Sequence, residues 1–242
     1  RSASANFGLF NQAVSGQSDF LIESPTQRLS TDVLPKLSNL AGDPDWHMVP
    51  VIEGSVTALD SESQPAQQLR LVGLDLMSLA NLPDLVENKI DFGEDESSWY
   101  DWLGSENLVW IGQATADKLG VEEGGEITIV ASGRRQQMGI RKIIKPDGSA
   151  LPDDLVIADI PTVQSLLSRP REINRVEVIL NRPDLRQDSG YLKEVEKRLT
   201  RGLPENISLS PTENRAVDRA AMTAAFRLNL TILSLIAILV GA

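Results

Sequence analysis

The hydrophobic pattern changes character near the C-terminal end of the chain. Residues Leu228–Ala242 include no charged side chain and are apolar on every side of a helix. A helix without a polar side must be buried in protein or in lipid. Because this run is shorter than the ~20 residues that cross a bilayer, we expect a membrane span cut short by the end of the chain. The predicted span residues are Leu228, Leu230, Ile232, Leu233, Leu235, Ile236, Ile238, Leu239 and Val240.

A helix-start signal precedes this run. Ser210, Pro211 and Glu213 occupy the N-cap, first and third positions of a capping box with a first-turn proline. Nothing in the sequence breaks the helix after Pro211, so the pattern predicts a stalk helix of ~48 Å over residues 211–242. Small residues repeat every four positions along its first half and would let another helix approach closely. They are Ala216, Ala220 and Ala224.

The N-terminal end carries a second helical pattern. Apolar residues fall at helical spacing in Ser2–Val14, which predicts a helix that continues a preceding membrane span. Phe7 and Phe10 are the candidates to pack against the small-residue seam. The chain also begins at Arg1 without an initiator Met. We therefore expect a domain that lies between two membrane spans, with residues 1–16 as its first stalk.

Between the stalks, alternating and amphipathic patterns predict an α+β fold. The first part has the order β-α-β-β, with a helix ending at Leu40 and strands at Asp19–Glu23, Met48–Leu59 and Gln68–Leu74. The last part has the order β-α-β, over Val176–Leu180, Tyr191–Leu199 and Ile207–Leu209. The middle part has its own elements, at Leu108–Ile111, Gln113–Leu119, Glu126–Ala131, Met138–Lys145, Leu155–Ala158 and from Pro161.

This order predicts a discontinuous porter-like α/β domain made of residues 17–78 and 176–210. A small α+β domain, residues 79–175, is inserted between its two pieces. Neither piece has enough elements for a core of its own, so the strands Asp19–Glu23 and Val176–Leu180 are expected to share one sheet. Residues 211–242 follow as the second stalk and the truncated span.

Charge and composition narrow the classes of function. The net charge of −11, from 34 acidic and 23 basic residues, argues against nucleic acid as a partner, because phosphates require Lys- and Arg-rich surfaces. An acidic segment beside a span favours the outer side of a membrane, since basic residues accumulate on the cytoplasmic side. The chain has no cysteine, which excludes disulfides, thiolate metal sites and cysteine catalysis.

The candidate chemistry is sparse. His47 is the only histidine, so this chain alone cannot build a zinc site or a serine–histidine triad. No G-x-x-x-x-G-K-[ST] phosphate loop is present, so ATPase activity would reside elsewhere. The acidic run Asp91–Glu96 lacks the spacing of a calcium loop. Three aromatic residues beside it are core anchors or a partner-binding patch: Trp99, Tyr100 and Trp102. We expect no catalytic residue, metal site or cofactor.

Several loose motifs occur in a characteristic order along the chain. They are Phe10–Gly16, Leu71–Asp75, Leu108–Gly112 followed by Ala116–Gly124, and Ala225–Leu230. In this order they resemble the extracytoplasmic domain of an ABC transporter permease of the MacB, FtsX and LolC–LolE type. Leu71–Asp75 resembles the V-x-G-x-D strand of that family, and Gly125-Glu126 stands where the family has Gly-Asp.

The resemblance implies a permease subunit that is not an enzyme. It implies a cognate ABC ATPase subunit, separate or fused, and a second permease copy in a homo- or heterodimer. The place implied is the bacterial inner membrane, with this domain facing the periplasm or the cell exterior. The function implied is mechanotransmission, in which cytoplasmic ATP hydrolysis drives work outside the membrane: export, handling of lipoproteins or peptides, or activation of a partner. A periplasmic or outer-membrane protein, or a lipoprotein, would be a further partner.

One alternative of another class remains open. A membrane-tethered domain that binds a ligand as a sensor, or that serves in adhesion, would also need an anchoring span. The permease predicts three or more further spans beyond Ala242 and no signalling module. The flanking sequence would therefore separate the two hypotheses.

Overall fold

The structure of the chain, a computed structural model, describes residues 18–40, 46–59, 66–75, 107–144, 153–186 and 188–212. Three sets of predicted features lie outside these ranges. They are the two stalk helices, apart from residues 211 and 212, with Phe7, Phe10, Ala216, Ala220 and Ala224; the span residues within Leu228–Val240; and the aromatic residues Trp99, Tyr100 and Trp102.

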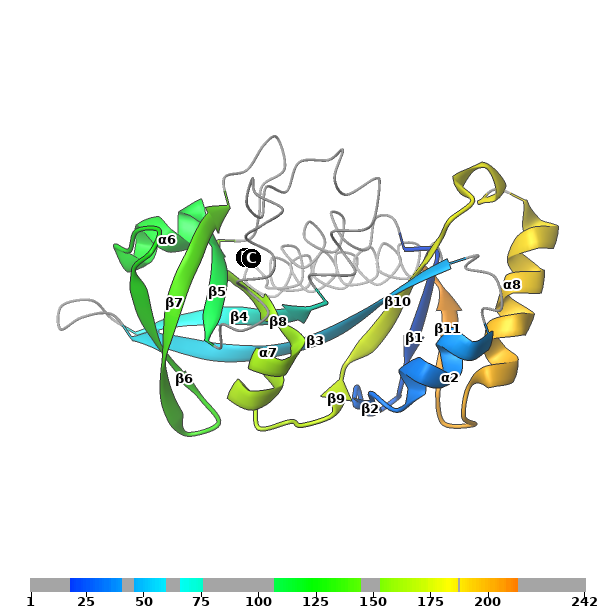
Figure 1. The fold of residues 1–242 in the computed structure, drawn as a ribbon, viewed down its shortest axis with the longest axis horizontal. Coiled ribbons are helices and arrows are strands. Elements are labelled where there is room, and N and C mark those ends of the chain that lie inside the picture. Colours follow the sequence, from blue (N-terminus) through cyan, green and yellow to red (C-terminus); the bar gives the residue numbers. More distant parts are fainter. Residues whose placement is uncertain are drawn as a thin grey trace, which may run out of the picture.

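Nine strands form one sheet in the order β11-β1-β10-β3-β4-β8-β5-β7-β6 (Figure 1). A separate two-stranded ribbon pairs β2 (Leu29–Ser30) with β9 (Glu172–Ile173). The strands of the main sheet are β1 (Phe20–Glu23), β3 (Trp46–Leu59), β4 (Gln67–Leu74), β5 (Leu108–Gly112), β6 (Glu126–Ala131), β7 (Arg134–Ile144), β8 (Leu155–Asp159), β10 (Arg175–Leu180) and β11 (Ser208–Pro211).

Part of this sheet closes on itself. β3 pairs with β6 through Thr57–Leu59 as well as with β4. The strands β3, β4, β8, β5, β7 and β6 therefore form a ring, which we call the barrel. The remaining strands β10, β1 and β11 continue the sheet from the other end of β3. Together with helices α2 (Val33–Leu40) and α8 (Ser189–Gly202) they form what we call the terminal layer.

The helices begin and end at residues that the sequence marks. α6 (Gln113–Leu119) contacts β5 and β7, and α7 (Ile160–Leu166) contacts β3 and β4. The N-cap of α7 is Asp159, whose Oδ1 accepts a hydrogen bond from Thr162 N at 3.1 Å. Gly120 ends α6 in the left-handed conformation with φ 64°. A short 3-10 helix, η2 (Pro183–Leu185), follows β10.

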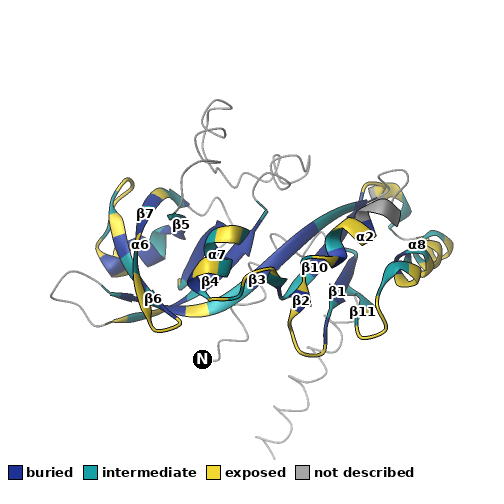
Figure 2. Ribbon diagram, turned by 60° about the horizontal axis from the view of Figure 1, so that its bottom comes forward, coloured by how far each residue is buried: buried dark blue, intermediate teal, exposed yellow. Residues whose placement is uncertain are grey.

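A hydrophobic cluster runs through both the barrel and the terminal layer. In the barrel it includes Ile129 and Met138, and in the terminal layer it includes Ile22, Leu37 and Leu199. Figure 2 shows the buried strands in the interior and the exposed outer sides of α2, α7 and α8. Because the cluster is continuous, the same apolar contacts stabilise both parts of the fold.

The main long-range expectation is confirmed. β1 pairs antiparallel with β10, with Leu21 opposite Glu177, so the two ends of the predicted split domain share one sheet. The α+β fold class is also confirmed. β6 and β7, both predicted as strands, form a hairpin, and its two turn residues Ser132 and Gly133 have φ of 47° and 75°. Two successive positive φ values are typical of a type I′ turn, whose twist matches that of the two hairpin strands.

The capping box predicted at Ser210 is wrong. Ser210 and Pro211 belong to β11, where they lie opposite Leu21 and Phe20 of β1. Thr212 is the first residue in helical conformation. The backbone of these residues hydrogen-bonds to β1 instead of starting a helix. Tertiary strand pairing therefore outweighs the local capping signal. Ser210 Oγ is buried without a hydrogen-bond partner in the described part of the chain.

Strand pairing also crosses the predicted domain boundary. β3 and β4 fall in the first piece of the predicted porter-like domain, whereas β5 to β8 fall in the predicted insert. β4 nevertheless pairs parallel with β8, with Val72 opposite Ile157, and the barrel needs strands from both. The division at residues 78 and 175 stays a prediction, and one sheet continues through both regions.

Two glycines allow α7 to approach the sheet closely. A Cβ on Gly73 of β4 would lie 2.4 Å from Ile52 Cγ2 and 3.0 Å from Val163 Cβ. A Cβ on Gly54 of β3 would lie 2.6 Å from Leu167 Cδ2. Ile52 and Val163 are fully buried and β-branched, whereas Leu167 is only partly buried and can rotate. Helix packing thus explains the glycine within Leu71–Asp75.

We expect Gly73→Ala to destabilise the protein by ~1–3 kcal/mol, because overpacking a rigid buried site forces the backbone to shift. Gly54→Ala is the matched control and should cost less, since the Leu167 side chain can move aside. Urea unfolding of both variants would measure the free energies. An equal loss of stability in the two variants would contradict this account of α7 packing.

Candidate functional site

The two ends of the described fold meet at one edge of the sheet. β1 begins opposite the residue with which β11 ends, Phe20 facing Pro211. Thr212 N donates to Asp19 O at 3.1 Å, and the hydroxyls of Thr212 and Ser18 are 3.4 Å apart. β1 and β11 lie side by side in Figure 1. The chain therefore enters and leaves this domain at the same place, which we call the terminal site.

Asp19 anchors the terminal site to β10. Its Oδ2 accepts a hydrogen bond from Leu180 N at 2.8 Å, and its Oδ1 lies 3.2 Å from Arg186 Nε. Arg186 Nη2 also donates to Leu180 O at 3.3 Å. The start of β1 is thus fixed to the end of β10 by a side chain as well as by the strand ladder.

The environment of Asp19 shifts its titration. Burial raises the pKa of the carboxyl above its usual range, and the Leu180 amide and the Arg186 charge offset only part of that shift. A carboxyl whose pKa rises on folding stabilises the fold in its protonated form. That contribution is present below the unfolded pKa and is lost as pH rises through the folded pKa.

A second ionic group joins β10 to β3. Arg175 forms ion pairs with Glu53 of β3 and with Glu177, whose Oε1 is 2.9 Å from Arg175 Nε. Only 1% of the Glu177 side chain is exposed. Removing one partner of a buried ion pair leaves an uncompensated charge and is strongly destabilising. We therefore assign these residues a structural role in the sheet.

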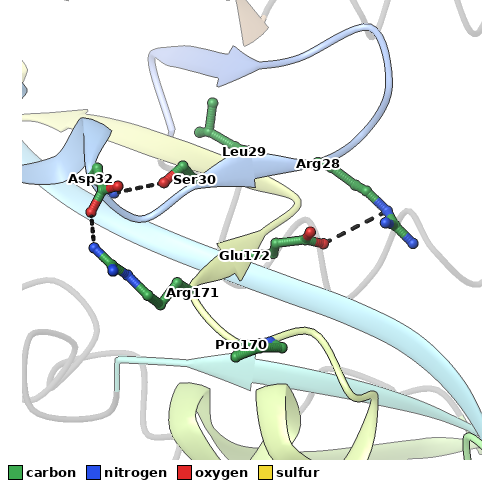
Figure 3. Close-up of a pocket in the computed structure, with 7 residues that line it drawn as sticks. All are labelled: Arg28, Leu29, Ser30, Asp32, Pro170, Arg171 and Glu172. Atoms are coloured by element: carbon green, nitrogen blue, oxygen red, sulfur yellow. Dashed lines mark hydrogen bonds and ion pairs between the residues drawn. The ribbon is translucent and has the colours of Figure 1, made fainter.

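An open surface pocket of about 360 Å³ lies between the ribbon strand β2 and the segment that leads into β9 (Figure 3). Two ion pairs cross it: Arg171 Nη2 to Asp32 Oδ1 at 2.5 Å, and Arg28 Nε to Glu172 Oε2 at 3.6 Å. Sequence reasoning missed this pocket, because its two walls are far apart in the chain. Its lining is Arg28, Leu29, Ser30, Asp32, Pro170, Arg171 and Glu172.

The sequence-predicted site residues fall largely outside the described ranges. His47 is described and lies in β3 opposite Ile179. Over the described residues, no helix is long and apolar enough to cross a membrane. The same residues contain no group of three or more His, Asp or Glu that could hold a metal ion. The terminal site, by contrast, is described, and its residues adjoin the two predicted stalks in the sequence.

No model of a protein family matches this chain. An uncharacterized ABC transporter permease protein of Mycobacterium tuberculosis is 30% identical to it over 143 residues. That match covers 58% of this chain and 16% of the relative, so the chain spans a small part of that relative's length.

Two solved structures share the fold. The extracellular domain of the noncanonic ABC-type transporter YknZ from Gram-positive bacteria aligns with a TM-score of 0.53 and 14% identity, covering 80% of this chain and 99% of that one. The periplasmic region of MacB from Actinobacillus actinomycetemcomitans aligns with a TM-score of 0.57 and 12% identity, covering 85% and 94%. These structures confirm the fold implied by the resemblance to MacB-type permease domains, and the relative that matches in sequence is an ABC transporter permease.

Asp19→Asn tests the anchor of the terminal site. Asparagine keeps an acceptor for Leu180 N but carries no charge, so it imitates the protonated aspartate. The unfolding free energy of the variant relative to the wild type should rise as pH increases from ~4 through the folded pKa of Asp19. Urea titrations across this pH range would measure the difference.

Asp184→Asn is the matched control with the opposite sign. The hydrogen bond from Arg182 lowers the pKa of Asp184, so its contribution is present above the unfolded pKa and lost as pH falls. The relative stability of this variant should therefore decrease as pH rises toward ~4, the usual pKa of an aspartate, and stay level above it, where that of Asp19→Asn rises. Urea titrations extended below pH ~4 would measure this difference. The same trend in both variants would contradict the assigned burial of Asp19.

Proposed function

We propose that this chain is the extracytoplasmic domain of an ABC transporter permease subunit and that it transmits ATP-driven motion to the outside of the membrane. The domain itself catalyses no reaction in this proposal. Its cognate ABC ATPase, separate or fused, hydrolyses ATP on the cytoplasmic side. Motion of the membrane spans reaches the domain through the two stalks and is turned into work on an exported cargo, a lipoprotein, a peptide or a partner protein.

The terminal site carries this proposal. A domain that lies between two membrane spans must receive and return the chain on the side that faces the membrane. The hydrogen bond from Thr212 N to Asp19 O, and the ladder between β1 and β11, put both connections together. A displacement of the stalks would thus act on one edge of the sheet.

The connection at this edge is stiff enough to pass a displacement onward. β1 lies between β11 and β10, and its residues Phe20 and Ile22 are buried in the hydrophobic cluster. The Asp19–Arg186 pair and the amide of Leu180 tie the beginning of β1 to β10. Force applied at either stalk therefore reaches the core of the sheet directly.

The remaining parts of the proposal concern residues outside the described ranges. Residues 1–16 and the residues that follow Thr212 act as stalks, in which Phe7 and Phe10 pack against Ala216, Ala220 and Ala224 of the same or a second permease copy. The apolar residues within Leu228–Val240 lie in the bacterial inner membrane. Trp99, Tyr100 and Trp102 contact a periplasmic or outer-membrane partner or a lipoprotein.

Inserting two glycines between Thr212 and Glu213 tests the stiff connection. The insertion interrupts the predicted stalk where it joins the sheet, and each glycine lowers helix stability by ~1 kcal/mol. In the assembled transporter, labels at Gln137→Cys in the two permease copies would report ATP-driven movement of the domains. We expect the insertion to reduce this movement more than ~5-fold while ATP hydrolysis continues.

The same two glycines inserted between Ser132 and Gly133 are the control, because this hairpin turn lies far from the terminal site in the strand order. In that variant the labels at Gln137→Cys should report the same ATP-driven movement as in the parent. Unchanged movement after the Thr212 insertion would refute transmission through the stalk. Absence of ATP-driven movement in the parent would favour the tethered ligand-binding domain instead.

A further inference from the structure

The ladder along one edge of β3 is interrupted, and side chains fill the interruption. β10 pairs with β3 as far as Val51, and β6 pairs with it from Thr57 onward. Between these strands, Glu53 N donates to Asn174 Oδ1 at 2.8 Å, and Arg169 Nη1 donates to Glu53 O at 3.3 Å. Two side chains thus replace a strand where the terminal layer ends and the barrel begins.

Arg169 is the centre of this contact. It follows α7, and its side chain is 15% exposed. Its Nε donates to Glu172 Oε2 at 3.2 Å and its Nη1 to Asn174 Oδ1 at 3.2 Å. Its Nη2 reaches Gln27 O at 3.5 Å. A planar guanidinium presents its donors in fixed directions, so these acceptors together fix the position of Arg169.

Asn174, which lies between β9 and β10, completes the contact. Its backbone N donates to Val51 O at 2.8 Å, and its Nδ2 donates to Gln27 O at 3.2 Å. The Gln27 carbonyl therefore receives both Asn174 and Arg169. Gln27 lies in the turn that follows β1, so the contact joins that turn, β3, β10 and the end of α7.

The backbone around this contact is held in uncommon conformations. Gln27, Ser168 and Arg171 have φ of 55°, 54° and 59°. A positive φ costs free energy in any residue other than glycine, because the Cβ crowds the backbone. Such conformations therefore persist only where surrounding contacts fix them. In the described part of the chain two further non-glycine residues have positive φ, Asn107 and Ser132, and they lie in other turns.

The contact connects the two parts of the fold by a route other than the strands. α7 packs on β3 and β4 of the barrel, whereas the turn at Gln27 follows β1 of the terminal layer. The exposed pairs Arg171–Asp32 and Arg28–Glu172 belong to the surface pocket described above. Exposed ion pairs contribute little stability, so the half-buried contacts of Arg169 and Asn174 are the ones that fix the geometry.

We propose that Arg169 and Asn174 form a coupling joint, which holds the barrel at a fixed angle to the terminal layer. The inference rests on the proposed function, since it supplies the step by which motion at the terminal site reaches the barrel. Both are positioning residues that act through Gln27 and Glu53. Without the joint, the pairing of β3 and the shared hydrophobic cluster still connect the two parts, but the angle between the barrel and the terminal layer varies over a wider range.

Distance measurements in the assembled transporter test the joint directly. The chain has no cysteine, so spin labels at Gln137→Cys in the barrel and Lys197→Cys in α8 report one distance. Both positions are exposed. We expect one narrow distribution in the parent and a population of other distances about tenfold larger in Arg169→Ala. Asn174→Ala should act in the same direction, and Arg169→Lys, which keeps the charge and one donor group, should lie between.

Arg182→Ala is the matched control, because it removes an arginine that pairs with exposed Asp184 away from the joint. It should leave the distance distribution unchanged. Thermal unfolding of each variant checks that the fold is retained, and Arg169→Lys decides the outcome if Arg169→Ala does not fold. A folded Arg169 variant with the parental distribution would overturn the proposal.

A second readout separates this inference from the proposed function. Single labels at Lys197 and at Gln137 in the two permease copies report ATP-driven movement of the terminal layer and of the barrel. With Arg169→Ala we expect Lys197 to move as in the parent, while the movement at Gln137 becomes smaller or broader. Equal movement at both positions would refute the joint alone. Absence of movement at Lys197 in the parent would refute the proposed function.

Discussion

The structure depends on the length of one strand. β3 pairs with β10 over its first half, with β4 along its opposite edge and with β6 at its end. Each pairing fixes which side chains face the interior, because a shift by one residue would turn the whole strand over. The barrel and the terminal layer thus share a register and a hydrophobic cluster. A displacement of one part is felt by the other through β3.

Arginines fix the segments that the ladder leaves apart. Arg186 binds Asp19, Arg175 bridges Glu53 and Glu177, and Arg169 fills the interrupted edge of β3. Apart from the Arg175–Glu177 pair, these contacts join segments that are distant in the sequence. The chain has a net charge of −11, and these arginines are paired with carboxylates and backbone carbonyls. The arrangement of the sheet thus relies on a few basic residues in an acidic chain.

Most local signals in the sequence were reliable, and one long-range expectation, the pairing of β1 with β10, was confirmed. The strands β3, β6 and β10 and the helix α6 were predicted from the hydrophobic pattern, because that pattern depends on neighbouring residues. The cap at Ser210 failed because a strand distant in the chain offered better hydrogen bonds. The closure of the barrel and the contacts of Arg169 have no periodic signature. They arise from side chains brought together only by the complete fold.

The pairing of β1 with β11 also governs how the domain is made. Ser208 Oγ donates to Glu23 O across a separation of 185 residues in the chain. Contacts of such separation slow folding, because the intervening chain must be ordered before they form. During synthesis, β1 cannot pair with β11 until nearly the whole domain has emerged. The last strand to arrive completes the site that faces the stalks, so assembly of the sheet and the joining of its two connections are one event.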